Sequence, residues 1–255
     1  MIRIVLLGAG NVATHLAETF LASGAVEILQ IYNRTEDSLL PFHGKIKTTT
    51  SLTELADADC YIISIADDSI AAVTDALPFS NKLVVHTSGS VAMEELSPKN
   101  RRGVFYPLQT FSRNHKVDFS QVPICIEAES KKDASLLEEI SNSIAGKSYF
   151  INSEQRQKLH LAAVFVCNFV NYLYHIGYEI TTENNIPFAI LKPLIKETAR
   201  KIEDAIPSEV QTGPAKRNDK KIIAKQLETL HLQEHKEIYN LLTNAITNYY
   251  GRKKL

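Results

Sequence analysis

The chain has few cysteines, almost no net charge and no long apolar run, and each absence excludes a class of protein. Cys60, Cys125 and Cys167 are widely spaced over 255 residues and lie in apolar surroundings. Three such cysteines form neither a disulfide framework nor a metal site. We therefore expect no metal, and we interpret all three as buried thiols of a protein in the reducing cytoplasm.

The charges nearly cancel, since 28 Lys and Arg face 29 Asp and Glu for a net charge of −1. A chain of this kind has no general electrostatic attraction for nucleic acid or for an anionic membrane. No apolar run approaches the roughly 20 residues that span a bilayer. The N-terminus begins directly in a predicted strand, so we also expect no signal peptide. The expected partner is a small-molecule substrate.

A glycine motif stands at the N-terminus. An apolar run that starts at residue 2 leads into Gly8-Ala-Gly10-Asn11-Val12, and an amphipathic stretch follows up to residue 21. In a strand–turn–helix unit of this kind, backbone N–H groups bind the pyrophosphate of a dinucleotide. Gly8 permits the tight turn, Gly10 leaves room for the phosphates, and Ala13 is an accepted third residue. The alternative is a purely structural turn.

The residues after the second predicted strand, 26–32, decide which dinucleotide is bound. Proteins that select NAD usually place Asp or Glu about 20 residues after the glycine motif. Asn33 has this spacing and carries no charge, and Arg34 and Thr35 follow it. A guanidinium binds the 2′-phosphate of NADP by charge-assisted hydrogen bonds. The segment favours NADP, although Arg34 as a solvated side chain at a strand end is the alternative.

Two further strands, 59–65 and 82–86, contribute the rest of the predicted site. Ligands of doubly wound sheets lie beyond the carboxyl ends of the strands. We expect the backbone after the first strand to line the adenosine and its ribose, and the small residues after the second to approach nicotinamide and substrate. His86 is a candidate hydrogen-bond donor to the nicotinamide or the substrate. The alternative is a polar side chain whose hydrogen bonds are made within the protein. The predicted cofactor residues here are Ser64, Ile65, Ala66, His86, Thr87 and Gly89, and Ser88 is assigned to the substrate.

Composition divides the chain into two domains. Strands at 103–111, 122–127 and 147–151, with a helix at 131–145, complete a Rossmann domain over 1–152. Pro123 indicates that 122–127 is an edge strand, because proline has no N–H to donate. Residues 153–255 are helical throughout, in segments near 154–184, 187–206, 217–231 and 233–250. The predicted fold is an α/β doubly wound domain followed by an all-α domain.

A polar stripe marks the first of these helices. At about 100° per residue, His160, Asn168, Asn171 and His175 fall within roughly an 80° arc, and the other faces are apolar. We expect this helix to be mostly buried, with the stripe facing either other helices or a substrate cleft between the domains. In the second case His160 protonates a nascent alkoxide, while Asn168 and Asn171 hold a carbonyl or carboxylate oxygen.

A second candidate lies at Thr212-Gly213-Pro214, which is followed by Arg217 and Asp219 at a helix start. An arginine at a helix N-terminus binds anions, so Arg217 and Asp219 are candidate substrate residues for a carboxylate. Asp219 as a plain helix cap is the alternative.

With these motifs the chain resembles a Rossmann-like NADP oxidoreductase family whose C-terminal helical domain is similar to that of 6-phosphogluconate dehydrogenase. The resemblance implies the same two domains and NADP binding. Wider relatives are pyrroline-5-carboxylate reductases, β-hydroxyacid dehydrogenases and ketopantoate reductases. The last two usually carry a catalytic lysine four residues before an asparagine. If that asparagine is Asn168, the lysine position holds Val164, which moves the expected proton donor to His160.

We therefore expect an NADP(H)-dependent oxidoreductase that reduces a small keto acid or imine in a cleft between its domains. Wider relatives commonly dimerise through the helical domain, so a homodimer is expected. Two alternatives stay open. One is ketopantoate reduction in particular, by family analogy. The other is an NADP-binding sensor or regulatory protein without catalysis, in which the polar stripe serves packing or partner binding.

Overall fold

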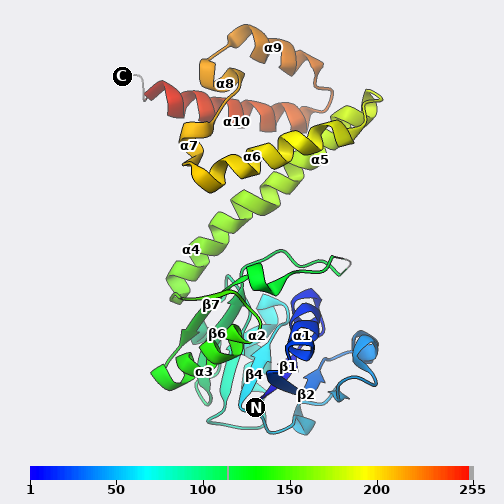
Figure 1. Cartoon of the computed structure of the whole chain (residues 1–255), viewed down its shortest axis with the longest axis vertical. Coiled ribbons are helices and arrows are strands. Elements are labelled where there is room, and N and C mark those ends of the chain that lie inside the picture. Colours follow the sequence, from blue (N-terminus) through cyan, green and yellow to red (C-terminus); the bar gives the residue numbers. More distant parts are fainter. Residues whose placement is uncertain (114, 253–255) are drawn as a thin grey trace. The chain divides into compact units, whose positions relative to one another are not determined.

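The computed structural model describes residues 1–113 and 115–252, and the statements below concern that part of the chain. It forms two compact units, Met1–Asn168 and Phe169–Leu255. The first unit holds the β-sheet and also helix α4 (Ser153–Ala163), and the second is helical (Figure 1). The predicted fold class, an α/β domain followed by a helical one, is confirmed.

The first unit is built on an eight-stranded sheet in the described residues, with the order β3-β2-β1-β4-β5-β6-β7-β8. All neighbouring strands are parallel except β6 and β7, which are antiparallel. The order reverses between β1 and β4, where doubly wound sheets have their ligand crevice. The strands are β1 Ile2–Leu7, β2 Val26–Tyr32, β3 Thr48–Thr49, β4 Cys60–Ile63, β5 Leu83–His86, β6 Arg101–Pro107, β7 Pro123–Ala128 and β8 Lys147–Phe150.

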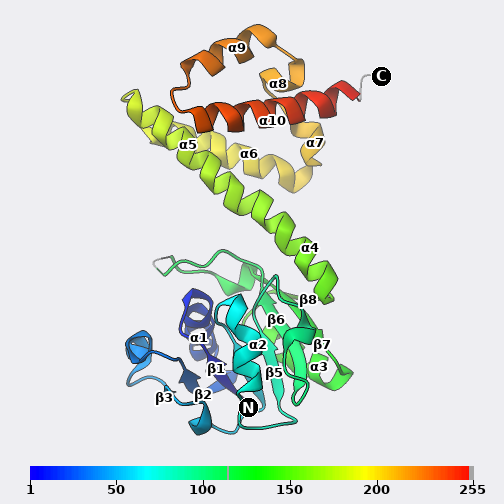
Figure 2. The same cartoon turned by 180° about the vertical axis from the view of Figure 1, so that it is seen from behind.

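Helices cover both faces of this sheet, which is why the central strands are continuously apolar where they are buried, at Ile4–Leu7 of β1 and Cys60–Ile63 of β4 (Figures 1 and 2). Ile4 and Leu6 of β1 pack in a core with α1 (Asn11–Ser23) and α3 (Lys131–Asn142). Val5 and Leu7 point the opposite way and pack with α2 (Ile70–Asp75). Alternation along a strand therefore sorts the apolar residues into two cores.

Strand β7 is not an edge strand, contrary to the expectation from Pro123. It pairs with β6 on one side and β8 on the other. Pro123 is its first residue, a position that proline occupies without removing a ladder hydrogen bond from the strand interior. Its carbonyl still accepts a hydrogen bond from the Leu108 N–H at 3.0 Å. The edge on this side of the sheet is β8.

A buried ion pair ties helix α4 to the sheet. Asn152 and Gln155 form a capping box at the start of the helix. One turn later Arg156, only 1% exposed, donates a hydrogen bond to Glu127 Oε2 of β7 at 2.5 Å and another to the carbonyl of Val91. Breaking a buried pair costs about 3–5 kcal/mol, so this contact fixes where α4 begins. His160 follows Arg156 by one turn.

The remaining helices are short or belong to the second unit. The 3₁₀ segments of the first unit are η1 Glu36–Phe42, η2 Leu52–Glu54, η3 Asp67–Ser69, η4 Met93–Glu95 and η5 Phe119–Gln121. After α4 the chain continues through η6 Val164–Phe169, α5 Val170–Glu183, η7 Phe188–Leu191, α6 Lys192–Asp204, α7 Pro207–Val210, α8 Pro214–Arg217, α9 Lys220–Thr229 and α10 Gln233–Arg252.

The helix Ser153–Glu183 is exposed, so the expectation that it is mostly buried is wrong. Leu161 and Val166 are 59% and 72% exposed, and Cys167 is half-buried rather than a core thiol. By length and composition this 31-residue helix is also apolar enough to cross a membrane, although no such segment was expected. One helix of this kind is weak evidence for a membrane protein.

Candidate functional site

The turn between β1 and α1 has the geometry of a phosphate cradle. Gly8 lies at φ 121°, and a Cβ there would sit 2.0 Å from the Ser64 carbonyl oxygen, so only glycine fits. Around Gly10, by contrast, a Cβ would meet nothing within 4 Å. Within the described residues no side chain caps α1, which leaves its first N–H groups available to an anion.

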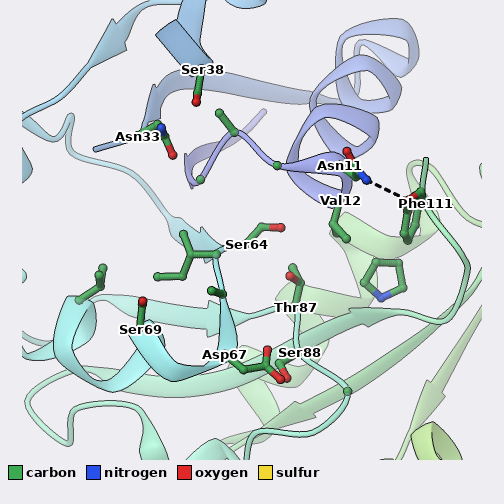
Figure 3. Close-up of a pocket in the computed structure, with 18 of the residues that line it drawn as sticks. Asn11, Val12, Asn33, Ser38, Ser64, Asp67, Ser69, Thr87, Ser88 and Phe111 are labelled. Atoms are coloured by element: carbon green, nitrogen blue, oxygen red, sulfur yellow. Dashed lines mark hydrogen bonds between the residues drawn. The ribbon is translucent and has the colours of Figure 1, made fainter. Parts of the chain in front are cut away.

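A cavity of about 770 Å³ opens beside this turn, along the carboxyl ends of β1, β2, β4, β5 and β6. Figure 3 shows side chains from all five strand ends around it, among them Asn11, Asn33, Ser64, Thr87 and Phe111. Nearly all of the residues predicted for the cofactor line the cavity together with Ser88: Gly8, Gly10, Asn11, Val12, Asn33, Arg34, Thr35, Ser64, Ile65, Ala66, Thr87 and Gly89.

The loop after β2 is held in place by its own side chains. Asn33 Nδ2 donates hydrogen bonds to the Thr35 carbonyl at 3.1 Å and to Thr35 Oγ1 at 2.9 Å. Thr35 Oγ1 in turn lies 3.1 Å from Ser38 Oγ. Arg34 is exposed on this loop and lines the cavity. An ordered loop with one guanidinium, two hydroxyl groups and an amide suits a sugar phosphate.

The loop after β6 was not predicted as part of the site. Asn11 Nδ2 donates a hydrogen bond to the Phe111 carbonyl at 3.1 Å, as Figure 3 shows, and His15 Nε2 lies 3.0 Å from the Ser112 carbonyl. Helix α1 thus holds this loop, and Arg113 on it lines the cavity with Gln109 and Tyr106. The local sequence did not predict that this loop belongs to the site, because the contacts join segments about 100 positions apart.

His160 is the predicted catalytic residue that reaches the cavity. Its Nδ1 lies 3.0 Å from the hydroxyl of Tyr106, which projects from β6. The ring also stands against Gly89, where a Cβ would come within 2.6 Å of Nδ1. The cavity therefore brings an imidazole together with Thr87, Ser88 and Gly89, the loop expected to approach nicotinamide and substrate.

His86 does not line the cavity, although it was predicted to bind the cofactor. Its side chain is fully buried, and its Nδ1 accepts a hydrogen bond from the Ser88 N–H at 3.1 Å. Nε2 has no hydrogen-bond partner among the described residues. Burial, together with the positive charge of nearby Arg156, lowers the pKa of His86 to about 3. The neutral His86 ring thus stabilises the loop after β5 through its contact with Ser88, and it does not line the cavity.

The structure does not place Asn168 at the cavity. It is exposed within η6, a π-helical turn that interrupts the α-helix. Such a turn closes i→i+5 hydrogen bonds and inserts a residue, so the 100° projection that aligned His160 with Asn168, Asn171 and His175 does not hold across it. The expected continuous stripe is therefore broken.

The other predicted substrate residues lie in the second unit. Asn171 is exposed on α5, and Arg217 ends α8. Asp219 caps α9, since its Oδ1 accepts a hydrogen bond from the Ile222 N–H at 3.2 Å. Asp219 therefore makes the contact of a plain helix cap, which was the alternative interpretation of this residue.

Two family models match the chain. The model described as "NADP oxidoreductase coenzyme F420-dependent" matches residues 3–89, and that described as "Domain of unknown function (DUF2520)" matches residues 122–246. The first covers the strand ends of the cavity from Gly8 to Gly89. No curated protein matches the chain in sequence.

Solved structures agree with these matches. A protein from Bacteroides fragilis, provisionally named an NADP oxidoreductase, is 40% identical, with 97% of this chain and 98% of that one covered and a TM-score of 0.89. A pyrroline-5-carboxylate reductase from Coxiella burnetii is 18% identical (98% of each chain, TM-score 0.60). An imine reductase from Myxococcus stipitatus, in complex with NADP⁺, is 13% identical (98% and 93%, TM-score 0.68). The last two show the fold alone.

The residues present fit NADP. The open space at Gly10 and the uncapped N-terminus of α1 suit a pyrophosphate, and Arg34 with Thr35 suits a 2′-phosphate. The predicted family resemblance is confirmed by a relative that matches over nearly the whole chain. The chain therefore belongs to the NADP oxidoreductases that join an N-terminal domain of this type to a DUF2520 domain, and its cofactor is NADP.

Proposed function

We propose that the protein reduces a small keto acid or imine with NADPH, and that His160 supplies the proton. The observation that carries this proposal is the position of His160. Its imidazole lines the same cavity as the Gly8–Val12 turn and as the Thr87–Ser90 loop. Among the described residues that line the cavity, it is the one histidine, and histidine titrates in the range that general acid catalysis at neutral pH requires.

The chain's own residues supply binding, orientation and a proton. NADPH, when bound, supplies the hydride. The α1 N-terminus and Arg34 hold the phosphates, while the small side chains of Thr87 and Ser88 leave room beside His160 for a substrate. In this arrangement a carbonyl oxygen or imine nitrogen next to His160 receives its proton from the imidazole.

Two further properties belong to the proposal. A homodimer is supported by the large apolar side chains that the second unit exposes, such as Leu194 at 62% and Leu241 at 71%. A cytoplasmic location is supported by Cys60 and Cys125, which are free and buried.

The experiment is a screen of purified protein for NADPH oxidation against 2-keto acids, 3-keto acids and cyclic imines. We expect turnover with one of these classes. We also expect His160→Ala to lower kcat by about 10²–10⁴-fold while the Kd for NADPH stays unchanged. His231→Ala, at an exposed position on the second unit, is the matched control. Tight NADPH binding without turnover of any compound contradicts the proposal and supports the sensor alternative.

A further inference from the structure

A tyrosine and a histidine from distant parts of the chain form a pair at the cavity wall. Tyr106 lies on β6 and His160 on α4, 54 positions apart. The Tyr106 hydroxyl is 3.0 Å from His160 Nδ1, and the rings meet edge to face at 75° with centroids 6.0 Å apart. Both residues line the cavity. The contact fixes one nitrogen of the imidazole and leaves Nε2 for other partners.

Gly89 makes room for this pair. A Cβ at position 89 would lie 2.6 Å from His160 Nδ1 and 2.9 Å from Tyr106 Cζ, so a side chain there would displace one of the rings. The backbone of Gly89 is not in the left-handed region, unlike that of Gly8. Its glycine is therefore explained by the two rings and not by backbone conformation.

The chemistry of a hydroxyl suits both protonation states of the imidazole. Burial raises the pKa of Tyr106 to about 12, so its hydroxyl keeps its proton at neutral pH. In the described residues this hydroxyl makes no other hydrogen bond. In the neutral resting ring it donates to the unprotonated Nδ1, so that the hydrogen of the ring is on Nε2, and in the imidazolium it accepts from the Nδ1 hydrogen. Phenylalanine does neither, although its ring has nearly the same shape.

We propose that Tyr106 is a positioning residue for His160, which holds Nδ1 so that Nε2 exchanges the proton with the substrate. This inference rests on the proposed function, in which His160 is the proton donor. In the step, the Nε2–H bond of the imidazolium breaks and an O–H or N–H bond forms on the reduced substrate. The electron pair stays on the ring, which is left neutral with its hydrogen on Nδ1, donated to Tyr106. Solvent then returns a proton to Nε2, and loss of the Nδ1 hydrogen to solvent restores the resting ring, in which Nδ1 accepts from Tyr106.

The first test measures the tautomer of His160 and needs no substrate. Full-length protein with ¹⁵N-labelled histidine rings is studied by long-range ¹H–¹⁵N NMR at about pH 8, where free imidazole is mostly neutral, with His160→Asn to assign the signals. We expect the wild type to carry its proton on Nε2, with Nδ1 as acceptor. Tyr106→Phe should give a mixture of both tautomers, and Gly89→Ala should do the same by separating the rings.

Tyr149→Phe is the control, since Tyr149 is 42% exposed on β8 and lies outside the cavity lining. It should leave the His160 spectrum unchanged. Identical tautomer populations in wild type and Tyr106→Phe would overturn the proposal.

The second test measures turnover with a substrate from the screen. Tyr106→Phe should lower kcat by about tenfold, the order expected for one hydrogen bond, while the KM and Kd for NADPH stay within about twofold. Full activity in Tyr106→Phe together with loss of activity in His160→Ala contradicts the positioning role of Tyr106 and leaves His160 as the proton donor. Full activity in His160→Ala contradicts the proposed function, and the tautomer measurement still decides whether Tyr106 positions the ring.

Discussion

At the scale of single residues, Arg34 is the side chain on which cofactor choice depends. It lines the cavity from a loop that Asn33, Thr35 and Ser38 hold in place. We predict that Arg34→Ala weakens NADPH by about 10- to 100-fold, because a hydrogen bond to a charged group contributes roughly 1.5–3 kcal/mol. NADH, which lacks the 2′-phosphate, should lose less than about twofold. Titration of both nucleotides measures the difference.

Arg200→Ala is the matched control for this prediction, since Arg200 is also an exposed arginine and belongs to the second unit. It should affect neither nucleotide. Equal losses of NADPH and NADH in Arg34→Ala would show that Arg34 does not contact the 2′-phosphate.

From the lowered pKa of His86 we predict that the free energy of unfolding decreases in acid. This pKa is lowered to about 3 by burial, whereas an unfolded histidine has a pKa of about 6.5. Between these values the unfolded chain binds more protons, so the contribution of the neutral ring is full above about pH 6.5 and declines as the pH falls toward 3. The expected loss from this residue at pH 5 is about 2 kcal/mol.

Denaturant unfolding at pH 7 and pH 5 measures this loss. His86→Gln should reduce the difference between the two pH values, and His231→Gln, at an exposed position, should leave it as in the wild type. An undiminished difference in His86→Gln would mean that another group carries the acid sensitivity.

At the scale of elements, the two glycines of the β1–α1 turn have different roles: Gly8 is needed for folding and Gly10 for nucleotide binding. Gly8→Ala places a Cβ 2.0 Å from the Ser64 carbonyl at φ 121°, so we predict a loss of several kcal/mol or failure to fold. Gly10→Ala meets nothing within 4 Å and should keep the Tm of the free protein. It should nevertheless weaken NADPH by about tenfold or more, since its methyl group occupies the space of the phosphates.

Thermal unfolding without nucleotide and NADPH titration test both variants. A Gly10→Ala protein with unchanged Kd would contradict the assignment of the pyrophosphate to this turn. A stable Gly8→Ala protein would contradict the close approach of β1 and β4.

The same scale shows where pattern reasoning fails. Short apolar runs and the glycine motif predicted the sheet and its crevice, because they depend on neighbours within a few residues. The polar stripe assumed a regular α-helix, and the π-helical turn Val164–Phe169 ended that regularity. Pro123 indicated an edge strand, but as the first residue of β7 it lies inside the sheet.

At the scale of the whole molecule, the proposed homodimer gives a direct prediction. The chain has a mass of 28.5 kDa, so sedimentation should show a species of twice that mass. Leu241→Asp, at a 71% exposed position on α10, should shift it toward the monomer without loss of helical circular dichroism. Asn244→Asp adds the same charge at an exposed polar position of that helix and should leave the dimer intact. A monomer at all concentrations would refute the proposal.

The sequence by itself determined the Rossmann domain, the phosphate-binding turn and the preference for NADP, because short apolar runs specify the strands of the domain and motifs of a few contiguous residues specify the turn and the preference. Only the tertiary structure decided that His160 packs against Tyr106 and Gly89, that Arg113 lines the cavity and that His86 does not. These outcomes depend on contacts between residues 29 to 100 positions apart, from the ion pair of Arg156 with Glu127, which fixes α4 on the sheet, to the hydrogen bond between Asn11 and Phe111. Local secondary-structure propensity does not predict such contacts, because they arise from packing between elements.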